Sequence, residues 1–197
     1  MKTAPLIVVL LLGILLAGCE PPPPATPKFH ATDITGADFA RNFELTDHNG
    51  QTRKLADFRG KLVVLFFGYT HCPDVCPTTL ADLASALKSM GSDADKVQVV
   101  FVTLDPERDT PSLLKQYVPA FHPAFLGLIP TAEQLKRLAA EYKVVYQKTA
   151  GSQKADYLMD HSAHTYVYDT QGRLRLLVGY GTPAKLIAQD LKVLLGH

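Results

Sequence analysis

Residues 61–77 read KLVVLFFGYTHCPDVCP and join an apolar run directly to two cysteines. The run at 61–67 is short and continuous, which predicts a strand buried on both faces. From 77 to 90 the apolar residues recur at helical spacing, which predicts a helix. Cys72 and Cys76 are therefore expected between the end of a buried strand and the start of a helix.

Strand and helix patterns alternate on both sides of this segment. Further strands are predicted at 43–46, 97–104, 144–147, 165–168 and 174–178. Further helices are predicted at 111–117, 131–142 with a capping box at Thr131, and 182–195 with Thr182 as cap. A turn at 169–172 makes the last two strands a hairpin. This order predicts an α/β, thioredoxin-like fold, in which helices flank a central mixed sheet and a β-hairpin lies near the C-terminus.

Composition narrows the function classes. The 197 residues include 20 basic and 19 acidic side chains, so no basic excess indicates a nucleic-acid partner. Hydrophobic residues make up 47% of the chain, which is typical of a folded domain. Three cysteines are too few for a disulfide scaffold. The length favours one domain, which we expect to span residues 33–197.

The N-terminus has a pattern of its own. Residues 6–18 are an unbroken run of 13 apolar and glycine residues, a length that suits a signal peptide (1–18) better than a membrane span. The sequence LAGC at 16–19 resembles a bacterial lipobox, which implies a lipid on Cys19. Residues 19–32 then form a proline-rich linker. An uncleaved anchor helix is the alternative, and both place the domain on the outer, periplasmic side of a bacterial cell membrane.

The two cysteines of the 61–77 segment have reactive surroundings. A thiol at a helix N-terminus has a lowered pKa, because the helix dipole favours the thiolate. Two thiolates four residues apart can form a disulfide or chelate one soft metal ion. The alternative is a purely structural disulfide, but a disulfide that closes so short a loop would stabilise the fold little.

Histidines provide a second cluster, DHSAH at 160–164, just before a predicted strand. In an extended chain His161 and His164 point to opposite faces, so at most one should face the cysteines. We favour His161, because the neighbouring Asp160 would orient its ring.

Three sequence blocks resemble the Sco (SenC/PrrC) family: YTHCPDVCPT at 69–78, DPERDTP at 105–111 and DHS at 160–162. The resemblance implies a thioredoxin-like fold with one copper bound by Cys72, Cys76 and His161. It also implies a role in assembling the copper A centre of cytochrome c oxidase, with subunit II or a related copper oxidase as partner. Some family members are thought to reduce that subunit's cysteines, so a thiol-disulfide oxidoreductase using Cys72 and Cys76 is the alternative function.

The residue types agree with this ligand set. Two thiolates and an imidazole suit Cu(I) and can accept Cu(II), although zinc also accepts such a set with a fourth ligand. Water, Asp160 and Asp74 are the candidates for a fourth Cu(II) ligand. A disulfide between the two cysteines would prevent copper uptake.

Other readings of the motifs remain. Thioredoxin-type oxidoreductases normally have CxxC rather than CxxxC. A peroxiredoxin would need Thr or Ser where Pro73 stands. The 105–111 block follows a strand end, where it shapes the site or contacts the partner. The alternative is that it only starts a helix, with Asp109 or Thr110 as its cap.

Overall fold

The computed structural model describes residues 27–150 and 157–196. The signal peptide predicted at 1–18, the lipid predicted on Cys19 and residues 20–26 of the linker lie outside this part of the chain. Within it, none of the helices combines the length and the apolar character that a membrane span requires. Near the start of the described chain, Phe29 packs against the core, and the backbone N–H groups of His30 and Ala31 donate to the buried carboxylate of Asp190.

In this described part, eight strands form one sheet and two form a second. The strands of the large sheet are β1 (Thr32–Asp33), β2 (Glu44–Asp47), β3 (Thr52–Lys54), β4 (Leu62–Gly68), β5 (Val97–Thr103), β6 (Leu126–Ile129), β9 (Thr165–Tyr168) and β10 (Leu174–Val178). Their order is β1-β10-β9-β4-β5-β6-β2-β3. The small sheet pairs β7 (Tyr146–Ala150) with β8 (Tyr157–His161).

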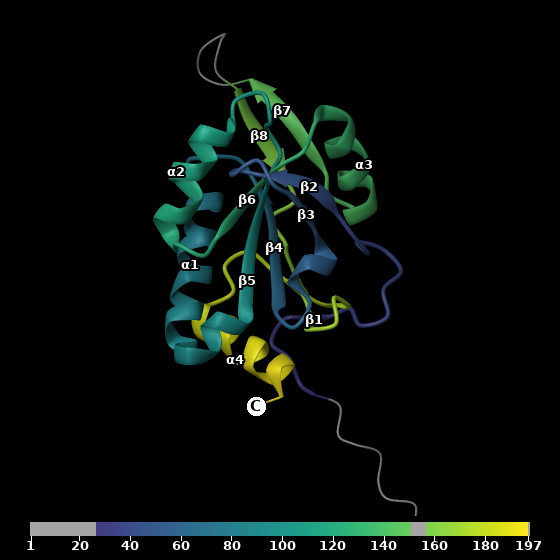
Figure 1. Cartoon of the computed structure of the whole chain (residues 1–197), viewed down its shortest axis with the longest axis vertical. Coiled ribbons are helices and arrows are strands. Elements are labelled where there is room, and N and C mark those ends of the chain that lie inside the picture. Colours follow the sequence, from purple (N-terminus) through teal and green to yellow (C-terminus); the bar gives the residue numbers. More distant parts are fainter. Residues whose placement is uncertain (1–26, 151–156, 197) are drawn as a thin grey trace, which may run out of the picture.

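Helices cover both faces of the large sheet (Figure 1). They are α1 (Val75–Met90), α2 (Pro111–Phe121), α3 (Ala132–Tyr142) and α4 (Ala184–Leu195), with short 3-10 turns at Leu55–Phe58 and Gly91–Lys96. Helix α1 packs against α4, whereas α3 lies on the other side of the sheet.

Strand β4 is the centre of the fold. All seven of its residues are buried, and it pairs parallel with β5 and antiparallel with β9. The sheet is therefore mixed, and β9 with β10 forms the predicted C-terminal hairpin. The predicted fold class, a thioredoxin-like α/β domain, is confirmed.

Some local predictions were incomplete or wrong. Strands β1, β3, β6 and β8 were missed: each has five residues or fewer, and β6 contains Gly127, so periodicity is weak there. Helix α2 runs past the predicted end to include Pro119. Thr182 is not the cap of α4: its hydroxyl donates to the Gly179 carbonyl at 2.8 Å, and Pro183 occupies the cap position.

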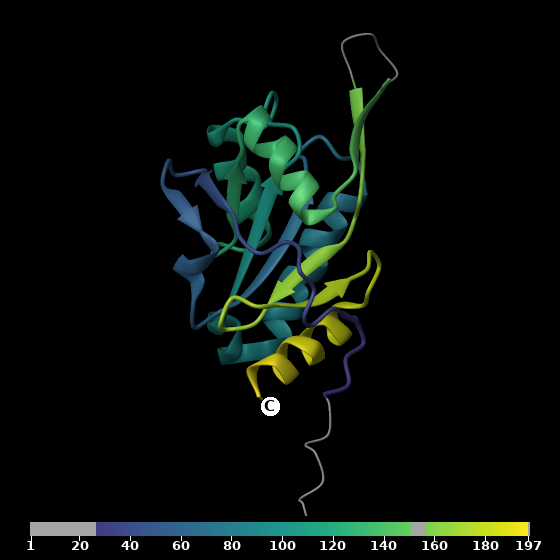
Figure 2. The ribbon, with the colours of Figure 1, turned by 90° about the vertical axis from the view of Figure 1, so that its right-hand side faces the viewer.

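The β7–β8 hairpin stands apart from the rest of the domain. Figure 2 shows the hairpin projecting beyond the body of the molecule. Its two strands pair only with each other, from Tyr146 opposite His161 to Ala150 opposite Tyr157. The hairpin ends at His161, which is one of the predicted ligands.

Candidate metal centre

Three side chains converge where β4 ends, α1 begins and β8 ends. The Sγ atoms of Cys72 and Cys76 and a ring nitrogen of His161 all lie within 4.8 Å of one another. His161 Nε2 is 3.5 Å from Cys76 Sγ, and the backbone N–H of Cys76 donates to Cys72 Sγ at 3.4 Å. The structure thus brings together all three residues predicted as ligands.

The thiols are placed by the junction of β4 with α1. Cys76 lies in the first turn of α1 and is fully buried, whereas Cys72 precedes the helix and is half-buried. Gly68 makes this packing possible, because a Cβ there would lie 2.8 Å from both Cys76 Sγ and an edge atom of the Phe101 ring. The first helical turn and a glycine therefore fix Cys76 beneath the more accessible Cys72.

The two cysteines have opposite acidities. The hydrogen bond from the Cys76 thiol is the main reason that the pKa of Cys72 falls to about 5, and backbone N–H groups of Asp74 and Cys76 add to the effect. The same hydrogen bond and burial raise the pKa of Cys76. At neutral pH the pair is thus an accessible thiolate beside a buried thiol.

The ring of His161 is oriented by its own chain. Its Nδ1 lies 2.9 Å from the Ser162 carbonyl oxygen, which only accepts, so Nδ1 carries the proton and Nε2 has the free lone pair. The expectation that Asp160 orients this ring was wrong, since Asp160 is exposed on β8 and alternates to the opposite side from His161. His164 is exposed and is not part of the group.

The 105–111 block starts a helix and also shapes the site. Thr110 caps α2 by accepting the N–H of Leu113, with Pro111 in the first turn. The fully buried Asp109 instead accepts from the backbone N–H of Thr70 at 3.1 Å and from its hydroxyl at 2.6 Å. The block therefore starts a helix and also holds the loop that leads to Cys72.

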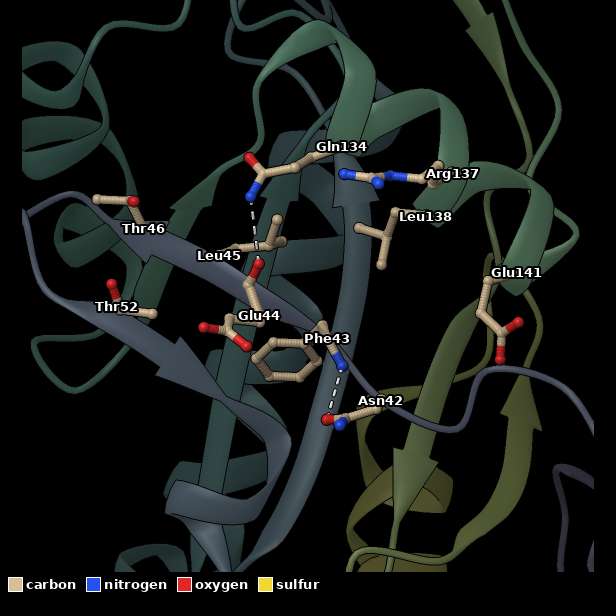
Figure 3. Close-up of a pocket in the computed structure, with 10 residues that line it drawn as sticks. All are labelled: Asn42, Phe43, Glu44, Leu45, Thr46, Thr52, Gln134, Arg137, Leu138 and Glu141. Atoms are coloured by element: carbon tan, nitrogen blue, oxygen red, sulfur yellow. Dashed lines mark hydrogen bonds between the residues drawn. The ribbon is translucent and has the colours of Figure 1, made fainter.

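A solvent-accessible cleft adjoins the three side chains. Cys72, His161, Asp74 and Asp160 all line it, but neither carboxylate belongs to the close group of possible ligands. A second groove, between β2 and α3, is lined by residues such as Glu44, with no cysteine or histidine among them (Figure 3). The chemistry therefore resides at the cleft beside the thiols.

Two aromatic residues support His161, of which sequence reasoning missed Phe66 and left Tyr69 open between lining the site and filling the core. Aromatic rings surround His161: those of Tyr69 and Phe66 lie edge-on, with centroids 6.0 and 6.3 Å from the imidazole. The Tyr69 hydroxyl also accepts the backbone N–H of Met159. Only the position of Tyr69 directly after a buried strand pointed to such a role, and that signal suits core packing equally well.

A thioredoxin-like domain with a CxxxC pair and a facing histidine defines a class of thiol- and metal-binding proteins. Comparison with known families narrows this further: the SCO1/SenC family model matches residues 31–196. The chain therefore belongs to the SCO1/SenC family.

Individual relatives agree with this membership. The mouse protein SCO2 homolog, mitochondrial, is 38% identical over 153 residues, which are 77% of this chain and 60% of the mouse protein. The structure of Bradyrhizobium japonicum ScoI with copper bound is 40% identical with a TM-score of 0.71, covering 77% of this chain and 96% of that one. A more distant structure is that of BsSco, described as a member of the Sco family of cytochrome c oxidase assembly proteins with a disulfide switch. It shares the fold at 19% identity with a TM-score of 0.65, over 83% of this chain and 96% of that one.

Proposed function

We propose that this chain is a membrane-anchored copper metallochaperone that assists assembly of the copper A centre of cytochrome c oxidase. The observation that carries the proposal is the group formed by Cys72, Cys76 and His161, whose donor atoms lie within 4.8 Å. The copper-bound relative at 40% identity and the assembly role described for BsSco support it.

The donor set suits copper as cargo. Cys72 is already a thiolate at neutral pH, because its pKa is about 5, and His161 offers an unprotonated Nε2. Binding must displace only the proton of Cys76, so copper uptake and proton release are coupled. Two thiolates and an imidazole are soft ligands that favour Cu(I).

Release requires that a partner's ligands reach the metal. The cleft beside Cys72 and His161 is open to solvent, which allows ligand exchange with a partner thiol or imidazole. Subunit II of cytochrome c oxidase, or a related copper oxidase, is the proposed partner. Lipid on Cys19 is the proposed anchor, since two acyl chains hold a protein stably at a membrane, with the domain facing the periplasm.

A thiol-disulfide oxidoreductase is the second candidate, and the unequal acidities of the two cysteines favour it. The Cys72 thiolate would attack a partner disulfide, forming a mixed disulfide and releasing one partner thiolate. Cys76 would then lose its proton to His161 Nε2, 3.5 Å away, and attack Cys72 Sγ. The products are a Cys72–Cys76 disulfide and a partner with both cysteines reduced.

A copper titration tests the main proposal. The full chain carrying Cys19→Ser, reduced and without oxygen, is titrated with Cu(I) against a competing chelator, beside the same chain with His161→Ala. We expect one tightly bound copper per chain, and weaker binding in the variant. Absence of competitive binding in the parent chain would contradict the chaperone function, and the reduction potential of the Cys72–Cys76 pair would then test the second candidate.

A further inference from the structure

The hairpin that carries His161 is held to the domain at only a few points among the described residues. Its strands make no ladder hydrogen bonds to the large sheet. At its base the hairpin is closed on itself, because the Ser162 N–H donates to the Val145 carbonyl and the Val145 N–H donates to the Ser162 hydroxyl. Against the body of the domain, Met159 is buried in the core, and Lys148 pairs with Glu107 at 2.7 Å. Further along, the Met159 N–H donates to the Tyr69 hydroxyl at 3.1 Å.

The strongest attachment is at Tyr157, the first residue of β8. Its hydroxyl donates to Asp105 Oδ1 at 2.7 Å, and its carbonyl accepts from Arg108 Nη1 at 3.0 Å. The guanidinium carbon of Arg108 lies 3.6 Å from the centroid of the Tyr157 ring. Arg108 also pairs through Nε with the buried carboxylate of Asp105. We call Asp105, Arg108 and Tyr157 the Tyr157 clasp.

We propose that the Tyr157 clasp is the element that positions His161 over the thiols. Tyr157 and His161 lie four residues apart on one strand, about 13 Å at 3.3 Å per residue, and their side chains share one face. Because Tyr157 is fixed at its ring, hydroxyl and carbonyl, the position of β8 along its own axis and its rotation about that axis are also fixed. The direction of the His161 imidazole follows from both. Asp105 and Arg108 act through Tyr157 and do not touch the thiols.

The clasp depends on two properties, its partial burial and the planar geometry of the Arg108 guanidinium. Asp105 is 1% exposed and the Arg108 side chain 19% exposed, so water competes weakly for their contacts. A planar guanidinium can donate to a carboxylate and a carbonyl while stacking on a ring, which an ammonium cannot do. Arg108→Lys therefore keeps the charge but breaks the clasp.

Copper affinity provides the first test, and this test rests on the proposed function. In the Cys19→Ser chain, we expect Arg108→Lys to weaken Cu(I) binding by roughly 10- to 100-fold, the usual effect of losing support for a metal ligand. Tyr157→Phe keeps the ring and the carbonyl and loses only the hydroxyl, so a smaller loss is expected. If Arg108→Lys does not fold, Tyr157→Phe carries the test.

A double-mutant cycle separates positioning from a general loss of stability. If Arg108 acts through His161, then Arg108→Lys should change the affinity less than about twofold once His161→Ala is present. An equal loss in both backgrounds would overturn the proposal. Tyr117→Phe is the matched control, because the Tyr117 hydroxyl is buried and has no hydrogen-bond partner among the described residues; a loss equal to that of Tyr157→Phe would also overturn it.

Amide hydrogen exchange tests the clasp without any metal. In Arg108→Lys we expect faster exchange at the Met159 amide, which donates to the Tyr69 hydroxyl outside the hairpin, and unchanged protection in β4. Unchanged exchange at the Met159 amide would refute the clasp. If the parent chain binds no copper, the proposed function fails while this measurement still decides the role of the clasp.

Discussion

The site is assembled from two regions that are built differently. Cys72 and Cys76 lie at the end of a fully buried central strand and in the first turn of the helix that follows it. His161 comes from a point 85 residues away from Cys76 in the chain, on a hairpin outside the large sheet. One region is part of the central sheet and its helix, whereas the other is attached through the buried side chain of Met159, ring contacts and a few polar contacts.

This difference separates two tasks. The acidity of Cys72 is set first by the Cys76 thiol and by backbone N–H groups, and His161 contributes less, while close packing at Gly68 fixes the position of Cys76. The imidazole completes the set only when the hairpin is held against the body. Under the proposed chaperone function, a fixed pair of thiolates with a separable third ligand would allow release of the copper without disturbing the core.

The largest expected effect is loss of a thiolate. Cys76→Ser should abolish competitive Cu(I) binding, since a serine hydroxyl is a hard and weakly acidic donor. His161→Ala should weaken binding by more than about 100-fold, because losing even an outer partner of a ligand costs 10- to 100-fold, and yet leave measurable binding. Chelator competition on the two variants gives this ranking. Equal losses would show that the thiol region does not dominate the site.

Gly68→Ala tests how rigid the thiol region is. The new Cβ would lie 2.8 Å from Cys76 Sγ and from the Phe101 ring, both of which are held in the core. We expect a loss of about 1–3 kcal/mol in the free energy of unfolding, as for overpacked cores. Chemical denaturation measures it. Gly179→Ala is the matched control, because nothing lies within 4 Å of a Cβ there; similar losses in both variants would mean that close packing at Gly68 is not the cause.

The acidity of Cys72 tests whether the thiol region works independently of the hairpin. The pKa of about 5 arises first from the Cys76 thiol, and His161 contributes less. The thiolate is the reactive form, so alkylation of Cys72 should rise through about pH 5 and level off above it, instead of near the ordinary thiol pKa of about 8.5. Mass spectrometry of the Cys72 peptide gives the profile.

Two variants separate the causes of that profile. Cys76→Ala should move the midpoint toward higher pH, because the thiol hydrogen bond to Cys72 is lost. Tyr157→Phe, which loosens only the hairpin, should leave the midpoint nearly unchanged. A large shift in Tyr157→Phe would mean that the two regions are electrostatically coupled, and the contrast between them would fail.

The same contrast explains what could be predicted from the sequence. The thiol region is local: a buried strand, two cysteines and a helix start lie within 61–90, and periodicity with helix-terminus chemistry was enough to place them. Strand alternation indicated that at most one of His161 and His164 faces the thiols. The reason given for choosing His161, its neighbour Asp160, was wrong because side-chain direction on an unrecognised strand was not known. The clasp joins residues about 50 positions apart, and such contacts leave no periodic signal.

The smallest expected effect comes from the hairpin's exposed ion pair. Lys148 on β7 lies 2.7 Å from Glu107, with side chains 47% and 71% exposed, beside the largely buried Asp105–Arg108 pair of the clasp. Solvent and salt screen exposed pairs, which contribute little. Lys148→Ala should therefore change Cu(I) affinity by no more than about twofold, and the difference from the parent chain should vanish at high salt. Because Lys148 and Arg108 bridge the same hairpin to the same loop, a loss from Lys148→Ala as large as that from Arg108→Lys would show that any tether suffices. The buried geometry of the clasp would then not be what holds His161 in place.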